Sequence, residues 1–125
     1  MQWLDGYNVS ILTCGISGSG KTHLLHGPIN NKKCSGILDS ISSNLFSLLD
    51  KKVSEYGHTY GGYRVGIQSF EIYSEMGRDL LDPVRDALDY GESDVYGPTL
   101  NGLSTSWVTD AIDLNQKMLQ VWKND

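Results

Sequence analysis

The chain has 125 residues, of which 39% are hydrophobic and 20% are charged, and its formal net charge is −5. This size and composition are typical of one soluble globular domain. The acidic balance argues against nucleic acid and anionic membranes as partners, because both select basic surfaces. Two cysteines are too few for a disulfide framework, and no apolar run approaches the roughly 20 residues that span a bilayer. The composition therefore predicts an intracellular protein.

The first half of the chain predicts one strand and two helices. Residues 9–14 (VSILTC) are a short run of apolar and β-branched residues, which is typical of a buried, parallel strand. Glycines then interrupt regular structure, and residues 21–26 are expected to open a helix. Between residues 36 and 49 apolar side chains recur at steps of three and four, which predicts an amphipathic helix. Residues 53–62 are expected to form a connector.

The second half predicts one long strand, a turn-rich region and a last helix. Residues 63–73 (YRVGIQSFEIY) are expected to form a long central strand, with a bulge at Gly66. Residues 86–103 are rich in glycine and turn signals, which is typical of small strands or a hairpin. Thr109 or Asp110 is expected to cap a helix over residues 111–123. This order of elements indicates an α/β fold.

Residues 15–22 (GISGSGKT) match the phosphate-loop pattern G-x-x-x-x-G-K-[ST] at every fixed position. Glycines allow the backbone to curl, so that successive N–H groups point at phosphate oxygens. Lys21 is expected to place its ammonium on the outer phosphates, and the Thr22 hydroxyl is expected to join the shell of a magnesium ion. The predicted strand before the loop and the predicted helix after it are the context that this motif requires. The sequence therefore predicts the binding of a nucleoside phosphate.

The loop alone does not define the reaction, because small-molecule kinases, GTPases and mechanical ATPases share it. Hydrolysis also needs an aspartate on a second strand for magnesium and a group that positions the attacking water. No residue of this chain is assigned a catalytic role from the sequence.

The stretch over residues 6–27 (GYNVSILTCGISGSGKTHLLHG) resembles the nucleotide-loop signature of the kinesin motor family. Further similar segments follow in the order of that family: SGI at 35–37, SFEIYSE at 69–75, DLL at 79–81 and NGL at 101–103. The resemblance implies a P-loop NTPase-type three-layer fold with a central mixed sheet, and a microtubule-dependent ATPase of the cytoplasm and cytoskeleton. The implied partners are microtubules, together with remaining motor segments or another chain.

By position, the resemblance assigns ATP and Mg²⁺ to the loop. Its binding residues are Gly15, Ser17, Gly18, Ser19, Gly20, Lys21, Thr22 and His23, of which Thr22 also contacts the metal and His23 lies against the adenine ring. Cys14, Ile16 and Ser17 replace the usual Tyr, Gln and Thr of the family. These changes leave the backbone nest intact.

Neither switch segment of the family, N-x-x-S-S-R-S-H or D-L-A-G-S-E, occurs in the 125 residues. The chain ends about where the first switch would begin, so the resemblance is to an incomplete motor domain with no more than background ATPase activity. Two alternative hypotheses are a non-catalytic kinesin-derived nucleotide-binding or scaffold module and an unrelated phosphate-loop kinase. Unpaired sheet edges and uncovered apolar surface also predict a poorly cooperative fold, or one that needs a partner.

Overall fold

The computed structural model describes residues 2–28, 36–84, 87–95 and 97–124. The chain divides into two compact units, residues 1–63 and residues 64–125, and each unit is described by itself. Helices and small antiparallel sheets make up a mixed α/β structure. Within the described ranges no helix combines the length and the apolar character that crossing a membrane requires.

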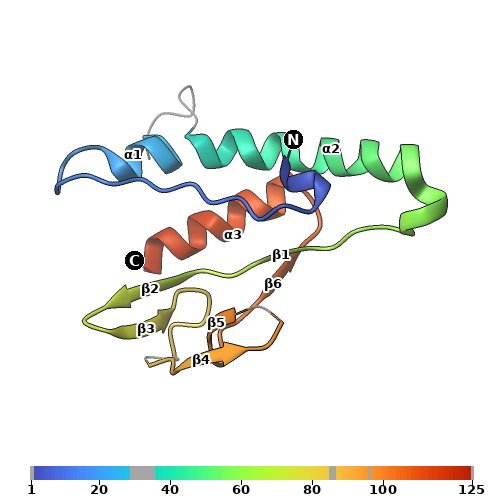
Figure 1. Ribbon diagram of the computed structural model, residues 1–125. Coiled ribbons are helices and arrows are strands. Elements are labelled where there is room, and N and C mark those ends of the chain that lie inside the picture. Colours follow the sequence, from blue (N-terminus) through green and yellow to red (C-terminus); the bar gives the residue numbers. More distant parts are fainter. Residues whose placement is uncertain (1, 29–35, 85–86, 96, 125) are drawn as a thin grey trace. The chain divides into compact units, whose positions relative to one another are not determined.

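The first unit contains the 3₁₀ helix η1 (Gln2–Asp5) and the helices α1 (Lys21–His26) and α2 (Ile37–Tyr60), with an extended stretch between η1 and α1 (Figure 1). Lys52 ties η1 to α2, because its Nζ donates a hydrogen bond to the carbonyl oxygen of Leu4 and lies 3.6 Å from Oδ1 of Asp5. This contact fixes the chain start on the middle of the long helix.

The inward face of α2 follows a spacing of four residues through Leu38, which is half-buried, and Ser42 and Phe46, which are buried. Ser42 is buried and donates from Oγ to the carbonyl oxygen of Leu38 at 2.8 Å, so its hydroxyl is satisfied inside the helix. The ring of Tyr63 packs near this face, with its centroid 6.3 Å from that of Phe46. Its hydroxyl donates to Oδ1 of Asp50 at 2.6 Å, and this bond, with burial and the Asp50 charge, raises the pKa of Tyr63.

Helix α2 runs past residue 49, its expected end, and through most of the expected connector over 53–62. The charged residues that follow Leu49 do not stop the helix, because each finds a favourable environment: Asp50 is exposed, Lys51 forms an i,i+4 ion pair with Glu55 at 3.9 Å, and Lys52 bonds to η1. Tyr56 departs from helical geometry (φ −124°, ψ 16°), and Gly61 ends the helix in the left-handed conformation.

Residues 9–14 do not form the expected buried strand. Val9, Ile11 and Leu12 are 54%, 57% and 87% exposed. A strand requires a neighbour that pairs with its N–H and C=O groups. Among the described residues no backbone hydrogen bond joins this stretch to another segment. The stretch is therefore extended, and no described segment pairs with it.

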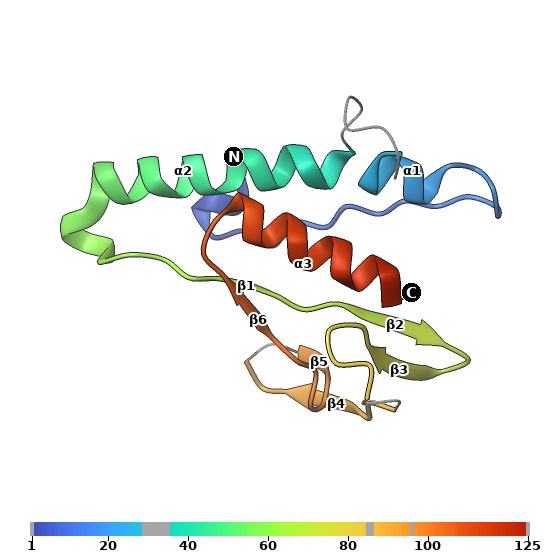
Figure 2. The same cartoon turned by 180° about the vertical axis from the view of Figure 1, so that it is seen from behind.

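The described part of the second unit contains three two-stranded antiparallel sheets and one helix (Figure 2). The pairs are β1 (Val65–Ile67) with β6 (Ser106–Val108), β2 (Phe70–Tyr73) with β3 (Met76–Asp79), and β4 (Tyr90–Ser93) with β5 (Gly97–Leu100). Gly66 lies opposite Trp107 in the first pair, and Ile72 lies opposite Gly77 in the second. The β4–β5 hairpin lies in the turn-rich region over residues 86–103.

The single strand expected over residues 63–73 is divided into β1 and β2. The two strands have different partners, and residues 68 and 69 lie between them. Gln68 bonds through Nε2 to Oγ1 of Thr105 at 2.9 Å, and the Ser69 carbonyl accepts from the Leu80 N–H at 3.0 Å. The described residues accordingly form no central mixed sheet.

Helix α3 (Ala111–Asn124) extends one residue beyond the expected range of 111–123. The Asp110 carboxylate accepts the N–H of Asp113 at 2.8 Å, while Asp113 accepts the N–H of Thr109 at 3.2 Å. These reciprocal bonds resemble a capping box, which satisfies N–H groups at a helix start. Val108 and Leu114 are buried where α3 follows β6.

Gly36 allows the start of α2 to approach the end of α1 closely. A Cβ atom at this position would lie 2.2 Å from the Leu25 carbonyl oxygen and 2.5 Å from the Gly27 nitrogen. We expect Gly36→Ala to destabilise the first unit by about 1–3 kcal/mol, because backbone atoms must shift to admit the methyl group. Thermal unfolding followed by circular dichroism measures this loss. Gly57→Ala in α2 is the matched control, since a Cβ there meets nothing within 4 Å; an equal loss in both variants would contradict the prediction.

Candidate phosphate-binding loop

The loop over residues 15–20 is a tight turn built on glycines. Gly15, Gly18 and Gly20 all have positive φ angles, of 152°, 79° and 91°. The Ser19 N–H donates to the Ile16 carbonyl oxygen at 3.1 Å and closes the turn. Residues with a Cβ rarely adopt such angles, so this curled backbone depends on glycine.

Gly15 is required by space as well as by its backbone angle. A Cβ atom on Gly15 would lie 2.5 Å from Oγ and 3.1 Å from Cβ of Ser19. At Gly18 and Gly20 a Cβ atom would meet nothing within 4 Å. The side chain of Ser19 therefore lies close to Gly15, while the space beside Gly18 and Gly20 stays open.

The Lys21 ammonium lies over the start of the loop. Its Nζ donates to the carbonyl oxygens of Gly15 at 2.7 Å and of Ile16 at 2.9 Å. An ammonium carries three N–H donors, so one donor remains for an additional acceptor. The lysine thus ties the two ends of the loop together and keeps a positive charge beside its backbone.

Thr22 and His23 lie in the first turn of α1, and both side chains are exposed. The Leu24 N–H donates to the Gly20 carbonyl at 2.9 Å, so the helix begins directly at the end of the loop. The eight predicted site residues therefore all lie within residues 15–23, on one loop and one helical turn. In the described ranges no group of three or more His, Cys, Asp or Glu side chains is arranged to hold a metal ion.

The sequence analysis missed the role of Asp79 at the end of β3. This carboxylate is 0% exposed and accepts three backbone N–H groups: from Leu81 at 2.8 Å, from Asp82 at 3.1 Å and from Ser104 at 2.7 Å. Burial alone would raise its pKa, but the Ser104 hydroxyl and these amides together hold the pKa below its ordinary value of 3.8. The signal in the sequence was an aspartate just before a Leu-Leu-Asp-Pro turn.

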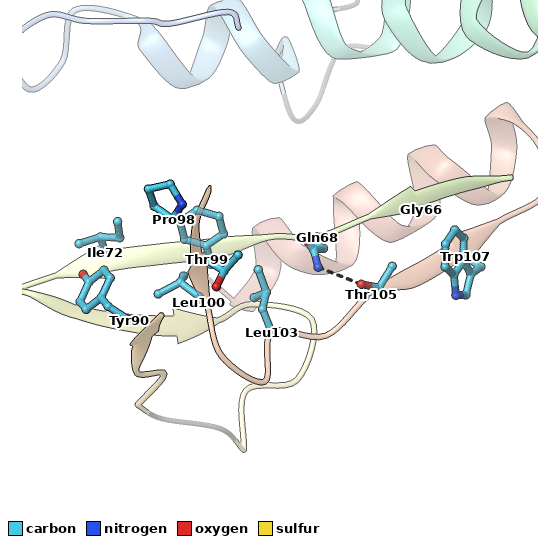
Figure 3. Close-up of a pocket in the computed structure, with 11 residues that line it drawn as sticks. Gly66, Gln68, Ile72, Tyr90, Pro98, Thr99, Leu100, Leu103, Thr105 and Trp107 are labelled. Carbon is cyan, nitrogen blue, oxygen red and sulfur yellow. Dashed lines mark hydrogen bonds between the residues drawn. The ribbon is translucent and has the colours of Figure 1, made fainter. Parts of the chain in front are cut away.

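The second unit also carries an open groove of about 780 Å³, shown in Figure 3. Its lining combines aromatic and aliphatic side chains, among them Phe70, Tyr90 and Trp107, with the amide of Gln68 and the hydroxyl of Thr105. None of the lining side chains is charged. The groove therefore offers apolar packing surface and several neutral hydrogen-bonding groups.

The fold and the loop define a mixed α/β chain with a phosphate-loop motif. Comparison with known proteins identifies the family of this chain. The kinesin motor domain model matches residues 1–125, so the chain belongs to the kinesin motor domain family. The resemblance found in the sequence is thereby confirmed.

Three relatives illustrate the similarity. The chain is 35% identical over 116 residues to kinesin-like protein KIF13B of Homo sapiens, a match that covers 91% of this chain and 6% of that protein. It is 33% identical over 126 residues to kinesin-like protein KIN-12B of Oryza sativa subsp. japonica, covering 93% and 11%. It is 31% identical over 108 residues to the kinesin heavy chain of Caenorhabditis elegans, covering 84% and 12%. The chain thus spans a small share of the length of these relatives.

Proposed function

We propose that this chain is the ATP-binding portion of a kinesin-like microtubule motor, and that residues 15–22 hold the phosphates. The observation that carries the proposal is the loop itself. Its motif is complete, its three glycines have positive φ angles, and Lys21 keeps its ammonium over the curled backbone. Membership of the kinesin motor domain family supports ATP as the nucleotide and microtubules as the partner. The cytoplasm and the cytoskeleton are the proposed location.

In this proposal each loop residue has a role in binding. N–H groups of the loop other than that of Ser19, which closes the turn, donate to phosphate oxygens, and Gly18 and Gly20 leave room for their approach. Lys21 directs its remaining donor to the outer phosphates. The Thr22 hydroxyl is a suitable oxygen ligand for Mg²⁺, a hard cation that usually retains several waters. Bound Mg²⁺ would neutralise phosphate charge, and His23, exposed in the same turn, would contact the adenine.

The finer fold that we propose is the three-layer P-loop NTPase type with a central mixed sheet. In it, residues 9–14 and the strands β1 and β2 become members of one sheet, with neighbours from further kinesin motor segments. The exposed apolar side chains of Val9, Ile11 and Leu12 support this proposal, because such a surface is costly to leave in water.

We predict that the 125-residue chain binds Mg-ATP without turning it over above background. Neither switch pattern occurs in its sequence, so no group is assigned to sense the γ-phosphate or to position water. Calorimetric titration with Mg-ATP measures binding, and phosphate release with and without microtubules measures turnover. Omitting magnesium is the control for binding through the Thr22 site. Microtubule-stimulated turnover by this chain would contradict the prediction.

A second candidate is a non-catalytic kinesin-derived module that binds nucleotide or serves as a scaffold, and the complete phosphate-loop motif supports its nucleotide-binding form. This candidate requires that the chain fold stably and keep its nucleotide affinity without further motor segments. A single cooperative unfolding transition, raised in temperature by Mg-ATP, would select it over the leading proposal.

A further inference from the structure

Lys52 on α2 joins this long helix to the residues that lead into the phosphate loop. Its Nζ donates a hydrogen bond to the carbonyl oxygen of Leu4 and lies 3.6 Å from Oδ1 of Asp5. The Lys52 side chain is 32% exposed, whereas that of the neighbouring Lys51 is 71% exposed. A lysine that bonds a carbonyl at the end of a helix stabilises that end. Lys52 therefore fixes the point at which the segment over residues 6–20 begins.

The other end of this segment also contacts α2. Helix α1 begins directly after Gly20, and its end packs against the start of α2 at Gly36. The two backbones are so close that a Cβ atom on Gly36 would lie 2.5 Å from the Gly27 nitrogen. Residues 6–20, which include the glycine turn of the phosphate loop, thus run between two points on one helix.

Helix α2 keeps a set distance between these two points. It is regular from Ile37 to Lys52, because its departure from helical geometry at Tyr56 lies further along the chain. With a rise of about 1.5 Å per residue, Gly36 and Lys52 are roughly 24 Å apart along the helix axis. A fixed separation of its ends limits the conformations that the segment between them can adopt. A loop that is already ordered loses less conformational entropy when it binds a ligand.

We propose that Lys52 is a positioning residue for the phosphate loop, and that it raises the affinity for nucleotide without contacting the nucleotide. By bonding to Leu4 and Asp5, it fixes one end of the segment whose other end is fixed by α1. The inference rests on the proposed function, since it concerns the same nucleotide site. Lys52 contacts residues that precede the stretch 9–14, so its role is compatible with the pairing of that stretch in a sheet.

Lys52→Met tests this role, because methionine is unbranched and favours helices as lysine does, but lacks the ammonium. We expect the dissociation constant for Mg-ATP, measured by calorimetric titration, to be roughly two- to tenfold higher than that of the unsubstituted chain. Lys51→Met removes the same charge from the adjacent position and should leave the affinity unchanged. Lys52→Arg keeps a charged donor and should restore most of the affinity.

A lysine that only stabilised the fold would lower the melting temperature and leave the affinity of the folded molecules unchanged. The titrations are therefore made well below the unfolding transition of every variant, and circular dichroism checks the helix content. Amide hydrogen exchange in the absence of nucleotide gives a second readout. We expect faster exchange in peptides that cover residues 2–8 and 15–22 of Lys52→Met, but not in those of Lys51→Met.

Asp5→Asn is a milder variant in case Lys52→Met does not fold. It removes the ion pair but leaves the Leu4 carbonyl oxygen as an acceptor, so we expect a smaller loss of affinity in the same direction. Equal affinities in Lys52→Met and Lys51→Met would overturn the role of Lys52 and leave the proposed function intact. A loss of affinity without faster exchange would also overturn that role, because the lysine would then not act by ordering the segment. If the unsubstituted chain does not bind Mg-ATP, the proposed function and the role of Lys52 are both wrong.

Discussion

We expect Asp79→Ala to lower the free energy of unfolding of the second unit by about 3–5 kcal/mol, enough to leave this unit largely unfolded. The substitution removes the shared acceptor of three backbone N–H groups, those of Leu81, Asp82 and Ser104. Each buried donor that loses its partner carries a desolvation cost. Urea unfolding followed by the fluorescence of the tryptophans measures the loss. Asp94→Ala, at an exposed position in the same unit, is the control and should be nearly neutral.

Asp79→Asn tests how much the negative charge of this side chain contributes to stability, because asparagine has nearly the same shape without the charge. The amide retains one oxygen acceptor but loses the negative charge, so we expect a smaller loss of roughly 1.5–3 kcal/mol. If Asp79→Ala unfolds the unit completely, this milder variant still gives a measurable transition. A loss no greater than that of Asp94→Ala in both variants would show that the buried hydrogen bonds contribute little.

The lowered pKa of Asp79 also predicts a dependence of stability on pH. The folded-state pKa lies below the ordinary value of 3.8, so the stabilisation is present above that value and is lost as the pH falls through the folded-state pKa. The unsubstituted chain should therefore lose stability in this acid range, and Asp79→Asn should lack that part of the loss. Parallel pH profiles in the two proteins would contradict the assignment.

Lys21→Ala should weaken the binding of Mg-ATP by about 1.5–3 kcal/mol, which corresponds to a roughly 10- to 150-fold higher dissociation constant. The variant loses the ammonium that would contact the outer phosphates. It also loses the two hydrogen bonds that join Nζ to the carbonyl oxygens of Gly15 and Ile16. Calorimetric titration at fixed ionic strength gives both affinities.

Lys51→Ala is the matched control for the phosphate loop. The substitution removes the same charge from the same unit, and the Lys51 side chain that it removes forms a solvent-exposed ion pair with Glu55 at 3.9 Å. Such a pair is worth little to stability, so this variant should keep both its fold and its affinity. Unchanged affinity in Lys21→Ala, in a protein that is demonstrably folded, would mean that residues 15–22 are not the site.

Local signals in the sequence describe the helices and the loop well. The spacing of apolar residues indicated both the long helix that became α2 and the helix after Asp110, because a buried helical face has the same period wherever it packs. The loop motif marked Gly15, Gly18 and Gly20, whose φ angles are all positive. The family resemblance was confirmed by the match over residues 1–125. The helical spacing and the loop motif depend on residues that lie close together in the sequence.

Pairing and distant contacts were not visible in the sequence. The composition of residues 9–14 favours a strand, but a strand also needs a partner, and none of the described segments pairs with it. The separate partners of β1 and β2 divided an otherwise continuous strand pattern. The hydrogen bonds of Asp79 could not be predicted from its local sequence, because one of its donors, Ser104, lies 25 positions away.

The pairing of β1 with β6 has a kinetic consequence. Ile67 pairs with Ser106, and the chain between them contains both local hairpins. Contacts between residues distant in sequence require a costly closure of the intervening loop, so they slow folding relative to hairpins. We infer that the two hairpins form early and that the β1–β6 junction closes last. Stopped-flow refolding of Val108→Ala should then show faster unfolding with little change in the folding rate; a slowed folding rate would place that junction in the nucleus.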